Sequence, residues 1–514
     1  MTNSAPAGHS QSEIERKYDV EDGAEVPDLS SVNGIATVDI REPVDLEAVY
    51  YDTERLDLAV RRIVVRRRTG GGDAGWHIKK PAAEGRTEQH WPLGDDTGTV
   101  PDEILEPVRA WVRDRDLTPL ARISTRRTAI HLVAADGTGV VEIADDEVTA
   151  TDVRRGGERS WREWEVELLD GAPDTEEGRT ALLDQIEGVI AEAGAHPSSS
   201  VAKVARALGV NSLTEVTPSA GDDAGDAAAD GTASAVLLPA IAELVETFKH
   251  ADPAARADAP DAVHRMRTLV RRLRSVLAAY RRLFDREVAD DLRERLGRIG
   301  SALGEARDLE VQGLRAESLL DELVSSDAEA RSRLVDGARS RYDTAHQRLR
   351  DVLSSTEYYR LLDDLDAFVA SPPLTDAASK PAKKVVKKVL GREVHRVRKR
   401  SDAVGAAGGE LESQLHAARK AGRRLRYAAE IVGAAGLRRA AAAASAGERV
   451  QDTLGEHRDS VFFGEYLVRT AERAEENGEK TAVYVALSEL SARRGTAALV
   501  DAAGALSDAC GLRP

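Results

Sequence analysis

A motif of one histidine and four arginines occurs twice in the second half of the chain, and the copies are 152 residues apart. The copies are His264, Arg267, Arg271, Arg272 and Arg274, and His416, Arg419, Arg423, Arg424 and Arg426. A second repeated motif follows each histidine after 39 and 38 residues, at Leu303–Asp308 and Leu454–Asp459. Two motifs that recur in order at nearly equal spacing indicate an internal duplication. Such a chain must build the same structural unit twice.

The charges of this motif predict an anionic partner. Steps of three, four and three residues place His264, Arg267, Arg271 and Arg274 on one face of a helix. Residues 264–282 contain seven arginines and no acidic residue, so local ion pairs cannot neutralise that face. Because like charges at helical spacing destabilise an isolated helix, the stripe favours a polyanion as ligand. The alternative is a pair of solvated amphipathic helices that are neutralised by acidic neighbours.

Charge is distributed unequally between the two halves of the 514-residue chain, which is long enough for two or three domains. Residues 1–230 hold 25 Lys and Arg against 46 Asp and Glu, whereas residues 231–514 hold 47 against 43. Cys510 is the only cysteine, which excludes a disulfide framework within the chain. The N-terminal residues lack the pattern of a secretory signal, and no run of about 18 apolar residues occurs. We therefore expect a cytoplasmic protein.

Short alternating stretches in the first half predict β-strands, with helices at 101–116 and 176–194 between them. The stretches are Ile14–Val20, Ala48–Tyr51, Ile63–Arg68, Trp76–Lys80, Ala129–Val133, Val140–Ile143 and Trp161–Leu168. A polar linker is expected at 211–235, and helices follow it, with breaks at Asp252-Pro253, Ser371-Pro372-Pro373 and Gly405–Gly409. The predicted fold class is α+β multidomain: an antiparallel β tunnel or barrel with crossing helices, and then an all-α, duplicated helical bundle.

The predicted strands share an unusual property, because one face of strand after strand is charged and carries both signs. On the predicted strands the charged residues that share a face are Glu13, Glu15 and Lys17; Arg66 and Arg68; His77 and Lys79; Arg86 and Glu88; Glu142 and Asp146; and Glu163, Glu165 and Glu167. Carboxylates bind hard divalent cations, and Arg and Lys neutralise phosphate oxygens. A charged interior therefore predicts a site that holds Mg²⁺ or Mn²⁺ together with a polyphosphate. An exposed edge strand is the alternative for any one of these faces.

Glu13-x-Glu15-x-Lys17 at the first predicted strand resembles the signature of the CYTH domain, the fold of the triphosphate tunnel metalloenzymes. The resemblance covers about residues 11–210. It extends in order through Tyr50–Thr53, Val65–Arg68, Gly75–Pro81, Arg86–Glu88, Arg122–Arg127, Glu142–Asp146, Glu163–Glu167 and Lys203.

This resemblance implies a role for each matching residue. The metal ligands would be Glu13, Glu15, Glu163, Glu165 and Glu167. The phosphate-binding residues would be Arg66, Arg68, Lys79, Arg86, Arg127 and Lys203. Lys17, Glu142 and Asp146 would serve catalysis, Lys17 at the phosphates and the two acids by orienting the attacking water or supporting the metal. The reaction implied is metal-assisted hydrolysis of a phosphoanhydride.

The second half resembles the CHAD domain, a duplicated helical module, over about residues 236–510, with repeats at about 236–372 and 373–510. The resemblance implies a basic surface that binds inorganic polyphosphate through His264, Arg267, Arg271, Arg274, His416, Arg419, Lys420, Arg423 and Arg426. Arg307 and Arg458 either contribute to it or form structural pairs with the aspartates that follow them. A third basic segment, predicted as an amphipathic helix, contains Lys380, Lys383, Lys384, Lys387, Lys388, Arg392, Arg396, Arg398, Lys399 and Arg400.

These features predict a metal-dependent hydrolase of inorganic triphosphate or short polyphosphate, fused to a module that binds polyphosphate or docks the protein on polyphosphate granules. One alternative is a polyphosphate-binding protein without enzymatic activity. Another is a nucleoside or thiamine triphosphatase or an adenylyl cyclase. Nucleic acid is disfavoured, because the arginine stripes carry only Tyr280 and Tyr427 as aromatic residues for base stacking. The sequence leaves the oligomeric state open.

Overall fold

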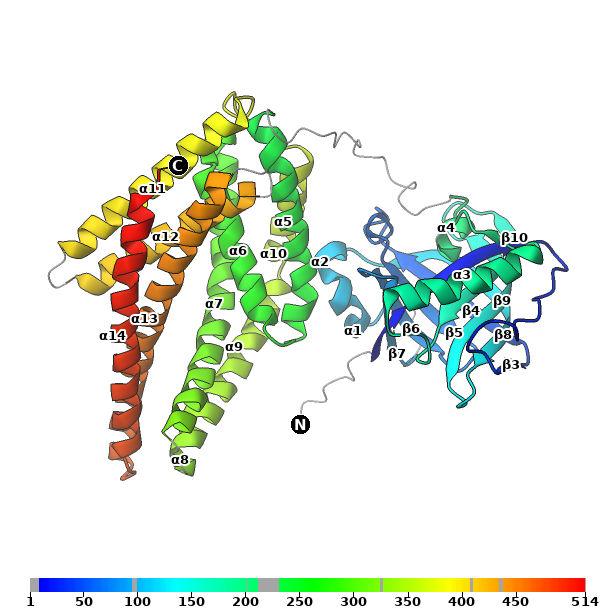
Figure 1. Cartoon of the computed structure of the whole chain (residues 1–514), viewed down its shortest axis with the longest axis horizontal. Coiled ribbons are helices and arrows are strands. Elements are labelled where there is room, and N and C mark those ends of the chain that lie inside the picture. The colour runs from blue at the N-terminus through cyan, green and yellow to red at the C-terminus, as the bar shows by residue number, and fades with distance from the viewer. Residues whose placement is uncertain are drawn as a thin grey trace. The chain divides into compact units, whose positions relative to one another are not determined.

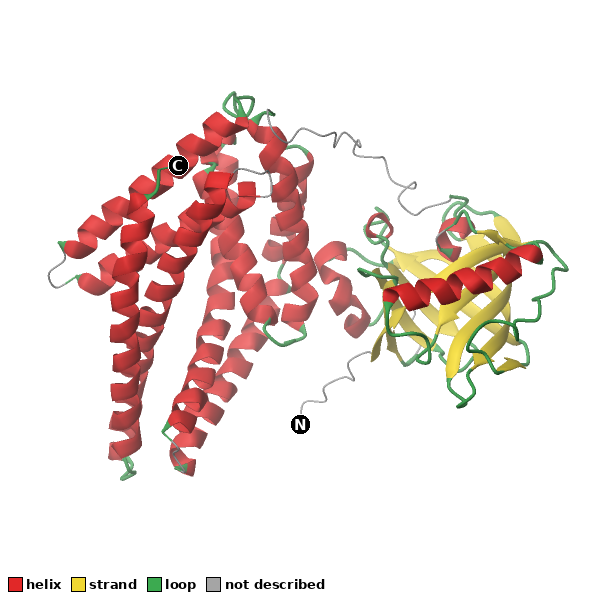
Figure 2. Cartoon of the chain, viewed as in Figure 1, coloured by secondary structure: helices red, strands yellow, loops and turns green. Residues whose placement is uncertain are grey.

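The computed structural model describes residues 9–94, 99–200, 202–210, 231–323, 327–406, 410–433 and 438–513. The chain divides into two compact units, Met1–Asp222 and Asp223–Pro514, of which the first contains a β-sheet and the second is helical (Figures 1 and 2). This agrees with the predicted fold class. Most of the predicted linker lies outside the described residues. No helix among the described residues is long and apolar enough to cross a membrane.

The first unit is an antiparallel sheet of eleven strands that curls around a central cavity (Figure 2). Its strands are β1 (His9–Glu13), β2 (Glu15–Val20), β3 (Thr37–Ile40), β4 (Val44–Asp52), β5 (Val64–Thr69), β6 (Gly75–Pro81), β7 (Arg86–Trp91), β8 (Thr118–Val133), β9 (Gly139–Asp152), β10 (Glu158–Leu168) and β11 (His196–Pro197). The order is β1-β7-β6-β5-β4-β8-β9-β10-β2-β11, and β3 pairs with β8. Strands β1 and β2 are consecutive in the chain but pair near opposite ends of this order. The chain at Ile14 therefore joins the two ends of the curled sheet.

The sheet packs its apolar side chains outward and its charged side chains inward. Helix α3 (Glu176–Glu192) covers the outer face, where its Ile186 and Ile190 form a core with Tyr18, Trp164 and other buried residues. The alternation along each strand then directs the intervening charged residues into the interior. Apolar burial therefore stabilises the sheet from outside and leaves its lumen polar.

The predicted helix at 176–194 is present, whereas the one at 101–116 is three short segments: α1 (Asp102–Leu105), a 3₁₀ turn (Glu106–Val108) and α2 (Arg109–Val112). Pro107 lies at the start of the 3₁₀ turn, and Arg113 ends α2 with a positive φ of 62°. A proline lacks an N–H donor, so a single continuous helix would lose a backbone bond there.

The second unit contains helices α5 (Ala233–Arg256), α6 (Ala262–Ala279), α7 (Arg286–Glu322), α8 (Ala328–Arg331), α9 (Gly337–Leu353), α10 (Thr356–Ala370), α11 (Ala382–Gly405), α12 (Leu411–Gly433), α13 (Arg438–Glu476) and α14 (Ala482–Gly511). The duplication is visible, because α5 and α6 repeat as α11 and α12, and α7 repeats as the long helix α13 (Figure 1). The two copies meet where Thr232 forms a bridge with Pro381, directly before α5 and α11. Helix α10 follows the first copy and has no described equivalent after α14.

One predicted break is wrong. Helix α5 continues through Asp252-Pro253 and ends at Arg256. Buried polar bonds hold this last turn, because Asp252 accepts from Arg256 at 2.5 Å and from the hydroxyl of Tyr358 at 2.8 Å. The break at Ser371-Pro372-Pro373 is confirmed, since α10 ends at Ala370. Helix α11 ends at Gly405, and residues 407–409 lie outside the described part.

Candidate functional site

Cross-strand register brings the charged residues of β8, β9, β10 and β2 into rows across the interior of the sheet. In one row Glu142 of β9 lies opposite Glu167 of β10, which lies opposite Glu15 of β2. In a parallel row Asp146 lies opposite Glu163. Directly opposed side chains in antiparallel strands lie within contact distance of each other. The repeated acidic residues therefore form one continuous surface, although they come from distant parts of the sequence.

These residues line a cavity of about 270 Å³, which we call the tunnel cavity. Its lining contains seven acidic residues: Glu13, Glu15, Asp73, Glu88, Glu142, Glu165 and Glu167. It also contains seven basic residues: Lys17, Arg66, Arg68, Lys79, Arg86, Arg127 and Lys203. The formal charges balance, so a bound divalent cation would make the lining positive toward an anion. Every tunnel residue predicted from the sequence lines this cavity except Asp146 and Glu163, which are buried beside it.

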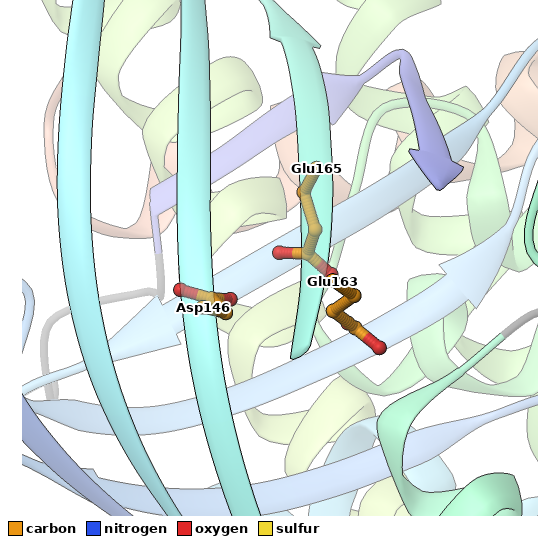
Figure 3. A group of neighbouring side chains, drawn as sticks. All are labelled: Asp146, Glu163 and Glu165. Carbon is orange, nitrogen blue, oxygen red and sulfur yellow. The ribbon is translucent and has the colours of Figure 1, made fainter. Parts of the chain in front are cut away.

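Asp146, Glu163 and Glu165 form the acidic cluster, in which one ligand oxygen of each residue lies within 4.8 Å of the others (Figure 3). Lys203, at the start of the short helix α4 (Lys203–Ala207), contacts all three carboxylates at 2.7–2.8 Å. Arg127 donates to Asp146 at 2.7 and 2.6 Å and to Glu165 at 2.8 Å. Carboxylate oxygens in this number and spacing are donors that suit a hard divalent cation.

The cations around the acidic cluster keep it ionised. Burial alone would raise the pKa of Asp146, but Lys203 and Arg127 lower it below its ordinary value. Burial likewise opposes ionisation of Glu165, but Lys17, Lys203 and Arg127 hold its pKa well below the usual range. The pKa of Lys203 is raised well above its ordinary value, because the three carboxylates outweigh its burial. Asp146 and Glu165 are therefore charged at neutral pH.

Glu13 lies in a different environment from the acidic cluster. Lys79 donates to both of its carboxylate oxygens, at 2.8 and 2.6 Å. Burial and a hydrogen bond with Glu88 raise the pKa of Glu13 to about 8, whereas the pKa of Glu88 is lowered because His77, Glu13 and Lys79 outweigh its burial. The pKa values of these two neighbouring carboxyl groups are therefore shifted in opposite directions. Glu15 contacts Lys17 at 3.0 Å.

Basic residues gather on the opposite side of the cavity, on β5 and β6. Arg66 reaches Glu88 at 3.4 Å, and Arg68 pairs with Asp73. Arg68 is only 7% exposed, and burial together with Arg66 and Arg127 lowers its pKa to about 9. Burial is the larger cause of this lowering, and repulsion from the two neighbouring guanidinium groups adds to it. The cavity thus has an acidic side suited to a cation and a basic side suited to an anion.

The helical unit contains a second cavity of about 500 Å³, which we call the arginine cavity. Its basic lining comes from both copies of the duplication and consists of His264, Arg267, Arg271, Arg307, Arg315, Arg419, Arg458 and Arg469. Burial is the first cause, and repulsion from neighbouring arginines the second, of the lowered pKa values of Arg271 and Arg419 in this lining. Crowded, partly buried guanidinium groups of this kind favour a polyanionic ligand.

Residues of the second repeated motif contact the arginines of the first repeated motif. A Cβ on Gly304 or Gly455 would lie 3.5 Å from the guanidinium group of Arg267 or Arg419, which is an ordinary contact distance, so each glycine lies directly beside one of these side chains. Arg267 donates to Asp308 at 2.8 Å. The two motifs therefore recur together because their side chains pack against each other on adjacent helices.

The structure brings only some of the predicted helical residues into the arginine cavity. His264, Arg267, Arg271 and Arg419 line it, whereas His416 lines an adjoining cavity of about 330 Å³. The remaining predicted residues, Arg274, Lys420, Arg423 and Arg426, are absent from either described lining.

Arg426 differs from its counterpart Arg274, because it is bound to Glu430 at 2.6 Å and to Glu448 at 2.8 Å. The sequence pattern did not single out Arg315, which reaches the cavity from the C-terminal part of α7. No spacing signal marks it, because it belongs to neither repeated motif.

Comparison with known proteins identifies both units. Residues 11–194 match the CYTH domain, and residues 239–468 match the CHAD domain. Two uncharacterized proteins from strains of Mycobacterium tuberculosis are 37% identical over 508 residues, covering 94% of this chain and 93% of each relative. The chain therefore belongs to the family of proteins in which a CYTH domain precedes a CHAD domain.

Two solved structures are also similar to parts of the chain. PptA from Streptomyces chartreusis is 19% identical, covers 54% of this chain and 100% of its own, and has a TM-score of 0.43. A putative adenylyl cyclase from Hippeastrum, described as having a dominant triphosphatase activity, is 16% identical, covers 38% of this chain and 95% of its own, and has a TM-score of 0.23.

Proposed function

We propose that the first unit is a metal-dependent hydrolase of inorganic triphosphate or short polyphosphate and that the helical unit binds inorganic polyphosphate. The observation that carries the proposal is the division of the tunnel cavity into an acidic and a basic side. A cation and a polyphosphate bound together need this arrangement. Membership of the CYTH and CHAD family supports the same assignment.

Asp146, Glu163 and Glu165 would hold Mg²⁺ or Mn²⁺, and Glu13, Glu15 and Glu167 are candidates for a second ion. A bound ion would neutralise phosphate oxygens and help to orient the substrate. The phosphates would lie against the basic side of the cavity, bound by Arg66, Arg68, Lys79 and Arg86, with Lys17, Arg127 and Lys203 at the acidic side.

The reaction would use water as the nucleophile. The described cavity lining contains no serine, cysteine or histidine that could form a covalent intermediate. Glu142 faces the cavity and contacts His131 at 2.9 Å, so its carboxylate is oriented to accept a proton from water. The water oxygen bonds to the terminal phosphorus, the anhydride P–O bond breaks, and the basic side chains stabilise the negative charge on the departing phosphate.

Binding without hydrolysis is the second candidate for the tunnel, and one observation favours it. Lys17, Arg127 and Lys203 already neutralise the acidic cluster through close ion pairs. A metal ion would have to displace some of these contacts. Nucleoside triphosphatase or cyclase activity has less support, because Tyr50 is the only aromatic side chain in the described lining.

Phosphate release from inorganic tripolyphosphate, measured with and without Mg²⁺ or Mn²⁺, tests the proposal. We expect metal-dependent release by the native protein and its loss in Asp146→Asn. Glu147→Gln is the matched control, because Glu147 is the next residue on β9 and is exposed. If the native protein binds tripolyphosphate and releases no phosphate with either metal, the tunnel is a binding site.

A further inference from the structure

A partly apolar cavity adjoins the arginine cavity in the helical unit. It has a volume of about 330 Å³ and is the cavity that His416 lines; we call it the side pocket. Its apolar lining consists of Leu415, Leu454, Val461 and Phe462. The two cavities meet at Arg458 and Phe462, because these two residues line both of them. A ligand that fills both spaces therefore combines an anionic part with an apolar part.

Phe462 is half exposed at the place where the two cavities meet. It is 53% exposed, whereas the next residue of α13, Phe463, is 3% exposed and packs in the hydrophobic core. The guanidinium carbon of Arg458 lies 4.8 Å from the centroid of the Phe462 ring. An aromatic ring that stays partly open to a cavity, with a cation beside it, is a platform on which a nucleobase can stack.

The first copy of the duplication has no such platform. Counted along the second repeated motif, Phe462 corresponds to Val311. The arginine of the motif also differs in its contacts, because Arg307 of the first copy pairs with Glu310 at 2.9 Å, whereas Arg458 lies beside the aromatic ring. Both copies form the same helices, so packing of the bundle does not require an exposed ring at this position.

The side pocket is less suited to phosphate than the arginine cavity. In its described lining Arg458 is the only lysine or arginine, and the exposed residues Glu412 and Glu465 contribute carboxylates that repel a phosphate chain. The buried imidazole of His457 contacts Glu412 at 3.0 Å. These carboxylates can accept hydrogen bonds from the amino groups of a nucleobase, and the Ser413 hydroxyl can donate or accept. The pocket therefore fits an uncharged heteroaromatic ring.

We propose that the helical unit binds a nucleoside polyphosphate, with its phosphates in the arginine cavity and its base on Phe462 in the side pocket. This inference rests on the proposed function of that unit for the phosphate end of the ligand. The two cavities have volumes of about 500 and 330 Å³, and sites for small molecules commonly measure about 300–1,000 Å³. A nucleotide bound there occupies arginines that inorganic polyphosphate also needs, so the two ligands compete.

The number of aromatic side chains favours a mononucleotide over a nucleic acid. Phe462 is the only phenylalanine, tyrosine or tryptophan in the described lining of the side pocket. Proteins that hold single-stranded nucleic acid stack successive bases on several aromatic residues. One platform beside one anion site matches a ligand with one base.

Phe462→Trp provides a local test, because the five tryptophans of the native chain all lie in the first unit. Fluorescence is measured in EDTA, which prevents metal-dependent hydrolysis, with the native chain as background. The ligands are ATP, tripolyphosphate and a single-stranded oligonucleotide. We expect ATP to quench the introduced indole by stacking and tripolyphosphate, which has no base, to reverse the quenching by competition.

Phe462→Leu tests the same contact by titration calorimetry. It should lower the ratio of ATP affinity to tripolyphosphate affinity about tenfold, because the stacking contact is lost. Val468→Ala is the matched control, since Val468 is an exposed apolar residue of the same helix outside both described linings, and it should leave this ratio unchanged. The tunnel cavity is identical in all these chains, so a difference between them reports on the helical unit. Unchanged melting curves establish that the variants fold.

An introduced indole that does not respond to ATP, or equal ratios in the native chain and Phe462→Leu, would overturn the inference. So would a response of the indole to the oligonucleotide at lower concentrations than to ATP, because the pocket would then belong to a nucleic-acid site. Polyphosphate binding without an ATP response rejects the inference alone. An ATP response that depends on Phe462, in a chain that binds no inorganic polyphosphate, supports the inference and rejects the proposed function of the helical unit.

Discussion

The proposed metal site can be detected through the melting temperature of a Lys203 variant, without an activity assay. The Lys203 side chain is 10% exposed, and its ammonium group lies 2.7–2.8 Å from all three carboxylates of the acidic cluster. Changing it to Gln removes a cation that contacts all three of these carboxylates, and breaking a buried ion pair in this way typically costs about 3–5 kcal/mol. For a unit of 222 residues this lowers the melting temperature by roughly 10 °C, at about 2–4 °C per kcal/mol.

A divalent cation should restore much of this loss, because it replaces the missing positive charge. We therefore expect Mn²⁺ or Mg²⁺ to raise the melting temperature of Lys203→Gln several degrees more than that of the native protein. Lys80→Gln is the control, since Lys80 donates to the Pro107 carbonyl at 3.0 Å and contacts no carboxylate among the described residues. Its destabilisation should not respond to metal. An equal metal response in native protein and Lys203→Gln would refute the assignment of the cluster as a cation site.

Further predictions concern phosphate binding in both units. Arg127→Gln should lower tripolyphosphatase activity by about 10²-fold or more. The neighbouring Arg126 points outward and its side chain is 60% exposed, so Arg126→Gln should leave the rate within about twofold. Arg419→Gln should weaken polyphosphate binding about tenfold, whereas Arg426→Gln should have little effect because Arg426 is already ion-paired; titration calorimetry distinguishes them. Burial, Lys420 and Arg458 lower the pKa of His416 to about 4, so the free protein keeps this imidazole neutral down to that pH. If a bound polyanion restores the pKa of His416 to its ordinary value near 6.5, affinity should rise about fivefold as pH falls from about 6.5 to 5.5, and His416→Gln should abolish most of that rise. A pH-independent affinity in the native chain would contradict this.

Local sequence patterns were sufficient to predict the charged interior of the sheet. Alternation places Glu163, Glu165 and Glu167 on one face without any knowledge of the fold, and the structure confirms that face as the inner one. Alternation cannot show which strands are neighbours. The meeting of Asp146 with Glu163 depends on the pairing of β9 with β10, and that of Glu13 with Glu88 depends on the pairing of β1 with β7.

The internal duplication was sufficient to predict some binding residues of the helical unit but not their ion-pair partners. The repeat identified Arg267 and Arg419, which line the arginine cavity from the two copies. The repeat also suggested that Arg426 acts like Arg274, although Glu448 of α13 neutralises it. Partners on another helix are set by packing, so spacing within one helix cannot reveal them. The predicted break at Pro253 is wrong for the same reason, because Asp252 and Arg256 form hydrogen bonds with Tyr358 and Ser354 of a distant segment, and these bonds hold the helix beyond the proline.

The central claim is that one cavity holds a divalent cation on its acidic side and a polyphosphate on its basic side. Anomalous diffraction from crystals grown with Mn²⁺ and tripolyphosphate tests it most directly. We predict a manganese peak within coordination distance of carboxylates of the acidic cluster, with phosphate density beside Arg66 and Lys79. A well-ordered tripolyphosphate with no manganese in the tunnel cavity, or manganese bound only on the outer surface, would contradict the account.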